Sequence, residues 1–467
     1  MHRLETTQLE ATPLSEDLSQ TAVEDLSQTA VEDLPQTAVE DLPRTAVEDL
    51  PRTAEWKPMR FLFLVDLVYE DMPGGSRVVA MEEAKRLVQR GHEVTLLAAR
   101  RTPEAPALEV REGVRIVRYG GAGNAAQFIR QGWRACAQLV AATQYDVVVT
   151  HFAYAALGPL QAVNASIPRL RVFHGPWDDE GWAEDQAALL ALPASQSSKR
   201  RLLGLKGRLK RAVRGRVETW NLRQSQKVVV LSRYMLAEVV GRGLSESAVS
   251  VIPGGTNVEK FVLASDKGAV RTALGLPLDR PLLLSVRRLT RRMGLDQLLQ
   301  AMPAVIAQCP DVLLLLGGQG PERVRLEQMV RDLGLGAHVQ LLGFIPDADL
   351  VQYYQAADLF VLPTIALEGF GLVTTEALAC GLPVVGTPVG ATPEILGRLD
   401  ERLITAGVSP EDLAQAITAY LETGGSWGLS PERLRAYVLE HYTWERHVDA
   451  MEVVAREMTQ SRRGSRS

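Results

Sequence analysis

The stretch Pro363–Pro383, with the sequence PTIALEGFGLVTTEALACGLP, decides the fold of this chain. It follows an apolar run that has the length of a buried strand, and it passes through a glycine-rich turn into a helix-forming segment. The glycines let the backbone approach a ligand closely. The free N–H groups at the start of the new helix, near Gly371, Leu372 and Val373, face an anion. The stretch therefore predicts a strand, a turn and a helix N-terminus that together bind a ligand.

Two glutamates bracket this turn, Glu368 before the helix and Glu376 within it. A vicinal diol such as a ribose suits the two oxygens of a carboxylate. One glutamate can hold one end of a ligand while the other accepts hydrogen bonds from hydroxyls at the far end. A single glutamate here would be interpreted as solvated, but two around a glycine-rich turn favour a functional site.

Outward from this stretch, strands alternate with helices along most of the chain. In the C-terminal half we expect a helix from about Leu295 and strands at 281–286, 312–316, 338–342, 358–362 and 383–386. In the N-terminal half we expect a helix at 76–90 and strands at 59–65, 94–98, 146–150, 170–173 and 227–231. This alternation predicts an α/β fold with two mainly parallel sheets. Ligands bind beyond the carboxyl ends of such strands, so two facing sheets predict an interdomain cleft.

The composition is that of a two-domain globular protein. The chain has 467 residues, a hydrophobic share of 46% and a formal net charge of −5, which suits two domains and excludes wholesale disorder. Three scattered cysteines are too few for a disulfide framework or a cysteine-based zinc site and fit a reducing cytosol. No run of about 18 apolar residues exists, so we expect no membrane span.

The first 55 residues differ from the rest in charge and pattern. They hold 13 acidic and 3 basic residues, a net charge of −10, whereas the remaining 412 residues carry +5. The unit TAVEDL recurs every eight residues, a period that fits no helix face, and Pro35, Pro43 and Pro51 would interrupt a helix. We interpret residues 1–55 as a disordered acidic repeat and not as a secretory signal peptide; a docking tail is the alternative.

A second cluster with chemical meaning is the arginine loop at 287–292, directly after the strand predicted at 281–286. Guanidinium groups bind phosphate with two parallel hydrogen bonds and stay charged, so four arginines in one short loop suit a diphosphate. A solvated basic loop is the equal alternative on this segment alone.

At this point a resemblance emerges. The C-terminal half resembles the donor domain of the retaining glycosyltransferases of family four (glycosyl transferases group 1), whose hallmark is two glutamates separated by seven residues. Matching segments are the Arg288 loop, Gly318–Pro321, Gly343-Phe344, Ala356–Pro363, Gly381–Val385, Gly390 and Glu394. The N-terminal half resembles the acceptor domain of the same family, with matching segments Gly74-Gly75, Arg90–Val94, Phe173–Gly175, Leu231-Ser232 and Pro253–Gly255. The resemblance covers roughly residues 59–458.

The resemblance implies a fold of two facing Rossmann-like domains, the B-type glycosyltransferase fold. The expected parts are an N-terminal acceptor domain at 56–258 and a C-terminal nucleotide-sugar donor domain at 259–440. A helix at 441–460 is expected to cross back onto the N-terminal domain, and 461–467 to form a disordered tail.

The resemblance also implies roles for individual residues. Glu376 would hold the ribose of a nucleotide-sugar, Glu368 the donor sugar near its reacting carbon, and His174, which follows a strand, would also contact that sugar. Arg288 and a second base would neutralise the diphosphate. The catalytic candidates are thus Glu368, Arg288 and His174, and the further substrate-binding candidates are Gly74, Gly75, Arg291, Arg292, Phe344, Ile345, Gly369, Phe370, Gly371, Leu372, Val373 and Glu376, with Phe344 and Ile345 flanking the base.

One position departs from the family pattern. The family usually has a lysine just before the glycine of the arginine loop, where this chain has Met293. Arg292 or Arg291 is the natural substitute.

The expected function is that of a retaining, hexosyltransferase-type glycosyltransferase without cofactor or metal. Arginine loops replace a metal in this resemblance, and we interpret Asp347 and Asp349 as helix-capping residues. The expected partners are a nucleotide-diphosphate-sugar and a glycan or lipid-linked acceptor, with no nucleic acid, at a cytoplasmic location. The alternatives are a nucleotide-sugar epimerase or hydrolase on the same fold, and a non-catalytic sugar-binding partner protein.

A basic stretch at 199–216 contains nine Lys or Arg residues and no acid. It predicts an amphipathic helix with two interpretations, contact with anionic lipid at the inner face of a membrane, or a solvated helix beside the cleft.

Overall fold

The computed structural model describes residues 57–68, 74–102, 104–120, 124–190, 196–425 and 427–464. All of the described residues belong to one compact unit, Ala54–Ser467. The predicted repeat at 1–55 and the last three residues lie outside the described residues.

The first sheet has eight strands in the order β3-β4-β2-β1-β5-β6-β7-β8. All neighbours are parallel except β3 and β4, which pair antiparallel. The strands are β1 (Arg60–Leu64), β2 (Glu93–Ala99), β3 (Leu108–Arg111), β4 (Val114–Tyr119), β5 (Val147–Thr150), β6 (Arg169–Phe173), β7 (Lys227–Val230) and β8 (Val249–Val251). The hairpin β3-β4 and strand β8 were not predicted, because β3 has an exposed, weakly apolar face and β8 is only three residues long.

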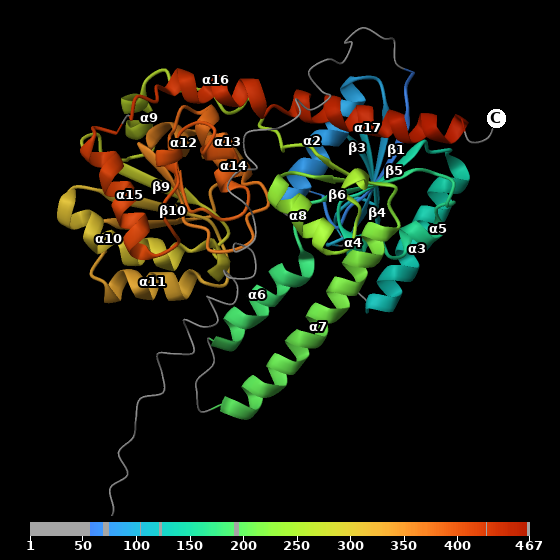
Figure 1. Ribbon diagram of the computed structural model, residues 1–467, viewed down its shortest axis with the longest axis horizontal. Coiled ribbons are helices and arrows are strands. Elements are labelled where there is room, and N and C mark those ends of the chain that lie inside the picture. The colour runs from blue at the N-terminus through green and yellow to red at the C-terminus, as the bar shows by residue number, and fades with distance from the viewer. Residues whose placement is uncertain are drawn as a thin grey trace, which may run out of the picture. The chain divides into compact units, whose positions relative to one another are not determined.

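The second sheet has five parallel strands in the order β11-β10-β9-β12-β13. They are β9 (Leu282–Val286), β10 (Leu313–Gly317), β11 (Val339–Gly343), β12 (Leu359–Leu362) and β13 (Val384–Gly386). Each lies within one residue of its predicted range, because fully buried parallel strands are short apolar runs. The two-sheet α/β fold with Rossmann-like halves is therefore confirmed (Figure 1).

Helices connect the strands throughout. In the first half they are α2 (Gly75–Gln89), α3 (Ala125–Ala142), α4 (Ala153–Ala156), α5 (Pro159–Ala162), α6 (Trp177–Leu190), α7 (Ser197–Arg223) and α8 (Arg233–Gly241), with the 3₁₀ turn η3 (Glu246–Ala248). In the second half they are α9 (Lys267–Ala273), α10 (Leu295–Gln308), α11 (Arg323–Asp332), α12 (Asp347–Ala356), α13 (Leu372–Ala379), α14 (Thr392–Leu396), α15 (Pro410–Glu422), α16 (Pro431–His441) and α17 (Trp444–Gly464), with η4 (Arg291–Met293) and η5 (Glu401–Leu403). The helix predicted from about Leu295 is α10, and it begins at that residue.

Each half has its own apolar core. In the second half, leucines and valines of β9, β10 and β12 pack against the buried faces of α10, α11 and α15. In the first half, one core joins β1, β2 and β5 to α3 and α5, and another joins β6 and β7 to α8. The two cores fix the strand ends from which the site residues project.

Two segments of chain pass between the halves side by side. Thr256 and Thr443 form a parallel bridge, and Thr256 N donates to the Tyr442 carbonyl at 2.8 Å. A Cβ on Gly255 would lie 2.6 Å from the backbone N of Trp444, so only glycine fits at this crossing. The fully buried Trp444 then begins α17.

Helix α17 packs along α2 of the first half (Figure 1). Arg90 pairs with Asp449 at 2.7 Å, and Arg86 pairs with Glu445 at 2.8 Å. Glu452 contacts His92 at 3.1 Å. The helix continues to Gly464, four residues beyond the predicted end at 460 and into the segment expected to be a disordered tail.

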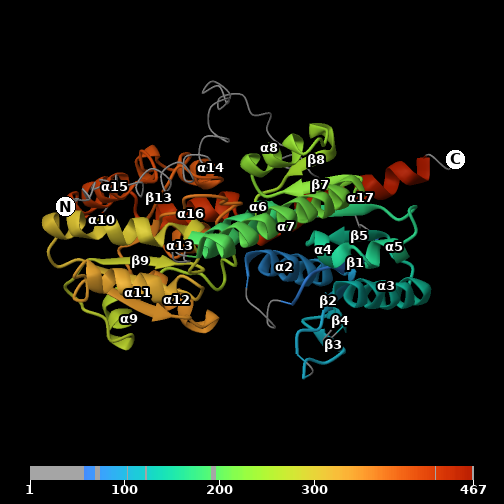
Figure 2. The same ribbon diagram turned by 90° about the horizontal axis from the view of Figure 1, so that it is seen from below.

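Helices α6 and α7 lie side by side as an antiparallel pair (Figure 2). Lys210 contacts Asp185 at 3.1 Å, and Arg211 contacts Asp179 at 2.7 Å. One face of the basic helix α7 is therefore used in pairing with acidic residues of α6. In the part of the chain that the structure describes, no helix combines the length and the apolar character needed to cross a bilayer.

Candidate active site

The centre of the candidate site is Glu368, in the loop between β12 and α13. Its Oε2 accepts hydrogen bonds from Arg287 Nη2 at 2.5 Å and from Thr364 Oγ1 at 2.9 Å. Arg287 Nη1 donates to the same threonine hydroxyl at 2.7 Å. Among the described residues no hydrogen bond occupies the other oxygen, Oε1, which stays available to a ligand.

Glu368 is ionised although it is buried. Burial alone would raise the pKa of its carboxyl group, but Arg287, Arg292 and the Thr364 hydroxyl together outweigh burial and hold the pKa below its usual value. The site thus holds one fixed negative charge at neutral pH.

Gly369 brings the two halves into direct contact beside Glu368. Its carbonyl accepts from Ser232 Oγ at 2.7 Å. A Cβ at Gly369 would lie 2.6 Å from the His174 carbonyl oxygen, closer than side chains approach, so this contact requires glycine. The predicted residue His174 therefore lies beside Gly369 and its chain neighbour Glu368, although about 195 residues separate them in sequence.

The arginine loop is divided between different tasks. Arg292 Nη1 donates to the Leu367 carbonyl at 2.9 Å, and its Nη2 contacts Glu180 Oε1 of α6 at 3.1 Å. Leu367 has a φ of +61°, a strained conformation for a leucine. Arg292 therefore fastens the strained turn that precedes Glu368.

Arg288 is the most exposed of the three predicted phosphate ligands of the arginine loop. Its guanidinium contacts Glu184 at 3.2 Å, and both side chains are about half exposed. Exposed pairs of this kind contribute little stability, so a phosphate can replace Glu184 at small cost. Arg291 lies in η4, and Met293 of the same turn is buried.

Glu376 lies in α13, where the Tyr354 hydroxyl donates to its Oε2 at 3.0 Å. Burial raises the pKa of Glu376 to about 7, against the opposing effects of this hydrogen bond and of Lys260. Hydroxyl groups of a ligand that donate hydrogen bonds to Glu376 would therefore stabilise its charged form.

Glycines of the first half lie close to the N-terminus of α13. Gly371 is the N-cap, with a φ of +81°. A Cβ on Gly254 would lie 2.8 Å from the Phe370 ring, and one on Gly75 would lie 3.9 Å from the Leu372 side chain. The predicted residues Gly74, Gly75, Phe370, Leu372 and Val373 thus gather around a helix N-terminus that has no side-chain cap.

Phe344 and Ile345 follow β11, at the far edge of the second sheet. Phe344 is 52% exposed, whereas Ile345 is buried against Gly317. The pair is therefore not in contact with Glu368, and only Phe344 presents a surface on which a base could stack.

Glu394 ties the second half to a helix of the first. Its two carboxylate oxygens accept from the backbone N–H groups of Arg233 and Tyr234 at 2.8 Å each, at the N-terminus of α8. Negative charge is favourable there. The sequence singled out Glu394 only as part of the resemblance, and nothing local predicted this partner.

Sequence reasoning missed three residues that complete the site. Arg287 belongs to the predicted arginine loop, but Arg288 was favoured; its position as the first polar side chain after the central strand β9 was the available signal. Glu180 lies in a stretch, 177–180, whose sequence fits an acceptor pocket and a plain loop equally, and no local pattern predicts its contact with Arg292. Thr364 donates to Glu368, four residues on, but its contact with Arg287 comes from a distant segment.

Asp347 and Asp349 do not cap α12, contrary to the prediction. The N-cap is Pro346, and both acids lie in the first turn, where they favour the helix dipole. Asp347 pairs with Lys260 at 2.5 Å. Among the described residues no group of three His, Cys, Asp or Glu side chains is arranged to hold a metal ion.

Two protein-family models match the sequence. The model described as Glycosyltransferase Family 4 matches residues 73–260, and the model described as Glycosyl transferases group 1 matches residues 266–438. Together they span both sheets.

Curated relatives agree with these matches. A D-inositol 3-phosphate glycosyltransferase 1 from Catenulispora acidiphila is 27% identical over 423 residues, which are 84% of this chain and 92% of that protein. A GDP-mannose-dependent monoacylated alpha-(1-6)-phosphatidylinositol monomannoside mannosyltransferase from Corynebacterium glutamicum is 30% identical over 223 residues, 46% of this chain and 58% of that protein. The chain spans about half the length of the first curated relatives it matches.

The fold also has solved counterparts. A sucrose-phosphate synthase from Thermosynechococcus elongatus superimposes with a TM-score of 0.68 at 24% sequence identity, covering 87% of this chain and all of that chain. At this identity the likeness concerns the fold alone.

Proposed function

The chain belongs to the glycosyltransferases of family 4, and its second half matches the glycosyl transferases group 1. We propose that it is a retaining enzyme that transfers a sugar from a nucleotide-diphosphate-sugar to a hydroxyl group. The acceptor would be a glycan, a glycolipid or a small molecule. The Corynebacterium relative is named for GDP-mannose and a phosphatidylinositol mannoside, which supports a glycolipid acceptor and makes GDP-mannose the first donor to test.

The observation that carries this proposal is the pair of glutamates around the N-terminus of α13. Glu368 is ionised and has one oxygen without a hydrogen bond. Glu376 has a pKa raised to about 7, so ligand hydroxyls that donate to it would stabilise its ionised form. Between them lies a helix N-terminus with no side-chain cap. We assign the ribose to Glu376, the diphosphate to the helix N–H groups and the sugar hydroxyls to Glu368.

Charge stabilisation would drive the reaction. As the bond between the sugar's anomeric carbon and the phosphate oxygen breaks, negative charge grows on the leaving diphosphate. We assign to Arg288, with Arg291 or Arg292, and to the α13 N–H groups the task of offsetting that charge, which is usually the largest contribution to catalysis. The acceptor oxygen would bond to the anomeric carbon on the same face, and its proton would pass to the leaving phosphate, so configuration is retained.

The direct test is nucleoside diphosphate release from GDP-mannose, UDP-glucose and ADP-glucose, with and without phosphatidylinositol or its mannosides as acceptors. We expect one donor to be consumed in an acceptor-dependent manner, and the product to keep the anomeric configuration of the donor by NMR. Acceptor-independent epimer or free sugar as the main product would indicate an epimerase or hydrolase instead. Donor binding without turnover on any acceptor would indicate a sugar-binding partner protein.

Metal independence is tested in the same assay. Arginines and helix N–H groups supply the positive charge that a cation would otherwise bring, so we expect turnover to be unchanged by EDTA. Loss of activity that Mg²⁺ or Mn²⁺ restores would contradict this part of the proposal.

We further propose that α7 contacts an anionic lipid surface. Leu202, Leu205, Leu209 and Val213 are spaced three or four residues apart, so they form one stripe along the helix, and each is more than half exposed. Lysines and arginines flank this stripe, while the opposite face pairs with the acids of α6. An apolar stripe between basic residues is typical of helices that lie in the membrane interface.

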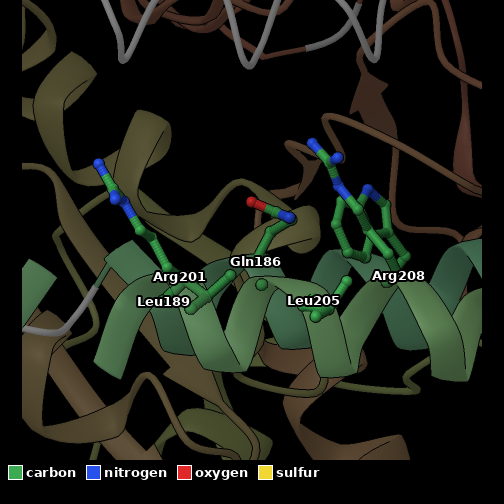
Figure 3. Close-up of a pocket in the computed structure, with 7 residues that line it drawn as sticks. Gln186, Leu189, Arg201, Leu205 and Arg208 are labelled. Atoms are coloured by element: carbon green, nitrogen blue, oxygen red, sulfur yellow. The ribbon is translucent and has the colours of Figure 1, made fainter. Parts of the chain in front are cut away.

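A hollow between α6 and α7 adds a place for an anionic group. It has a volume of about 380 Å³, and its apolar floor includes Leu189 and Leu205. Arg201 and Arg208 stand on either side of it (Figure 3). Two guanidinium groups above an apolar floor fit a phosphate headgroup with its chain.

The lipid contact is tested by sedimentation with vesicles of phosphatidylglycerol or of phosphatidylcholine. We expect binding to phosphatidylglycerol alone, weakened at least tenfold in a Leu205→Asn, Leu209→Asn variant, since each buried leucine contributes about 1.5–3 kcal/mol. The matched control is Leu278→Asn with Val324→Asn, two exposed apolar residues away from α7. Equal binding by both variants, or none by the unaltered protein, would contradict the proposal.

A further inference from the structure

A line of buried polar side chains runs from His447 of α17 to His174 through Glu83 of α2 and His151, which follows β5. His447 of α17 lies with Nδ1 2.7 Å from the Pro253 carbonyl and Nε2 2.9 Å from Glu83 Oε1 of α2. The second oxygen of Glu83 lies 3.4 Å from His151 Nε2, at the end of β5. His151 Nδ1 in turn lies 3.2 Å from His174 Nε2.

All three groups behind His174 are buried, and the roles proposed above use none of them. Glu83 is 0% exposed, and His151 and His447 are each 2% exposed. A carboxyl group at such a site costs several kcal/mol unless it is paired. Glu83 meets this condition by pairing with His447, and the pairing leaves its second oxygen to face His151.

The hydrogen positions along this line can be worked out one step at a time from the Pro253 carbonyl. The Pro253 carbonyl can only accept, so His447 Nδ1 carries a hydrogen. One proton then lies between His447 Nε2 and Glu83 Oε1, whichever of the two holds it. Glu83 is left with a lone pair on Oε2. This atom and His151 Nε2, 3.4 Å away, are both buried and without a hydrogen-bond partner in the described part of the chain.

The same logic continues to the site. His151 is neutral, because burial first, and then the neighbouring His174 and Arg171, place its pKa well below the usual value. We place its single hydrogen on Nε2, because two lone pairs facing each other at 3.4 Å in a buried site would repel, whereas a hydrogen on Nε2 faces the Glu83 lone pair favourably. Nδ1 of His151 is then an acceptor, so the hydrogen of neutral His174 lies on Nε2 and its Nδ1 keeps a free lone pair.

We propose that Glu83, His151 and His447 form a relay that fixes the tautomer and ring orientation of His174, so that His174 Nδ1 accepts a hydrogen bond from a hydroxyl of the donor sugar. His174 Nδ1 is a buried atom without a partner in the described part of the chain, as a site awaiting a donor hydrogen would be. The rings of His151 and His174 are stacked, 5.4 Å apart at 21°, which holds the orientation. The three are positioning residues, and the part that concerns the sugar rests on the proposed function.

The tautomer is read directly by ¹⁵N NMR of protein labelled on histidine, a measurement that needs no substrate. We expect His174 to be neutral with hydrogen on Nε2, and His447 with hydrogen on Nδ1. In Glu83→Leu and in His151→Phe we expect the His174 signals to shift towards a mixture of tautomers. Hydrogen on His174 Nδ1 in the unaltered protein, or an unchanged tautomer in both variants, would overturn the relay.

Kinetic measurements with the donor that proves active then test whether the relay serves catalysis. A hydrogen bond displaced at the reacting sugar costs up to about 100-fold in rate, so we expect His151→Phe to lower kcat about 10- to 100-fold with donor KM changed less than threefold. Phenylalanine suits the aromatic contact of His151 with Phe63, so the variant should fold.

Glu83→Gln is the conservative control. Its amide N–H₂ can donate to His447 Nε2 while its carbonyl oxygen accepts from His151, which preserves the direction of every hydrogen bond. We expect it to keep kcat within threefold and to keep the His174 tautomer. Equal loss in Glu83→Gln and Glu83→Leu would overturn the relay, whereas absence of any transferase activity, with the NMR result as expected, would overturn only the proposed function.

Discussion

At the residue scale, neighbouring arginines of one loop have separate tasks. Arg287 is buried and compensates the charge of Glu368, whereas Arg288 is exposed and held only by a weak surface pair. Sequence alone could recognise the loop but not this division. The difference is decided by which side chain faces β12, and that depends on the packing of β9 beside β12.

The first prediction contrasts these two arginines. Arg287→Met leaves a buried carboxylate without its partner, which costs about 3–5 kcal/mol, so we expect a clear fall in Tm along with loss of activity. Arg288→Ala removes an exposed pair of little energetic value, so Tm should stay within about 1 °C while turnover falls at least 100-fold. Thermal unfolding and kcat measured on both variants check this. Near-normal turnover in Arg288→Ala would contradict its assignment.

The second prediction concerns the pH dependence of donor binding. The pKa of Glu376 is raised to about 7, so the carboxyl group is mostly protonated at pH 6 and mostly ionised at pH 8. Ribose hydroxyls bind the ionised form better, so donor affinity should rise about tenfold between pH 6 and pH 8 and then level off.

Calorimetry with GDP-mannose, or with whichever nucleotide-sugar proves active, measures this change. An intact nucleotide-sugar has no terminal phosphate group that titrates in this range. The control is Glu376→Gln, which should bind more weakly and lose the slope. A slope that survives in Glu376→Gln would assign the titration to another group.

At the element scale, α17 completes the first half from the end of the chain. Its Glu452 contacts His92 at 3.1 Å and also pairs with Arg90 and Arg456. Burial acts to raise the pKa of Glu452, but His92 and Arg456 overcome it and lower the pKa to about 2.

The third prediction follows from that shift. A carboxyl group whose pKa is lowered by folding stabilises the protein above its unfolded value, and this stability is lost as the pH falls from about 4.5 towards 2. Glu452→Gln should therefore lower Tm by about 2–8 °C at pH 7. The difference from the unaltered protein should shrink as the pH is lowered below about 4.5. A difference that does not change with pH would show that packing, and not charge, sets the effect.

At the scale of the whole molecule, the alternation of strands and helices was predictable, and much of the site was not. A strand such as 281–286 can be predicted from its own residues, because burial on both faces of a parallel sheet requires a continuous apolar run. Glu180 and Glu394 act through partners more than 75 residues away in sequence, and Thr364 joins its near neighbour Glu368 to the likewise distant Arg287. No local pattern records such pairs. Gly369 was predicted as a ligand-side glycine, and the structure adds that it also admits the His174 carbonyl.

The fourth prediction concerns residues 1–55. They are strongly acidic and repetitive, and the predicted site lies entirely outside them. Because this composition predicts a segment that takes no part in the folded enzyme, a chain that begins at residue 56 should keep kcat and donor KM within twofold in the transferase assay. A tenfold loss would show that this segment acts in catalysis or in acceptor capture.

The docking of α17 on α2 also bears on the order in which the protein is made. Domains generally fold as they leave the ribosome, N-terminal first. Here the first domain must wait for about 200 further residues before His447 reaches Glu83, since β8 ends at Val251 and α17 begins at Trp444. During that interval the face of α2 that carries Glu83 is exposed to solvent, although Glu83 is fully buried once α17 has packed on it. Synthesis of α17 therefore completes the first domain, and a chain interrupted before Trp444 is expected to leave this face open to chaperones and proteases.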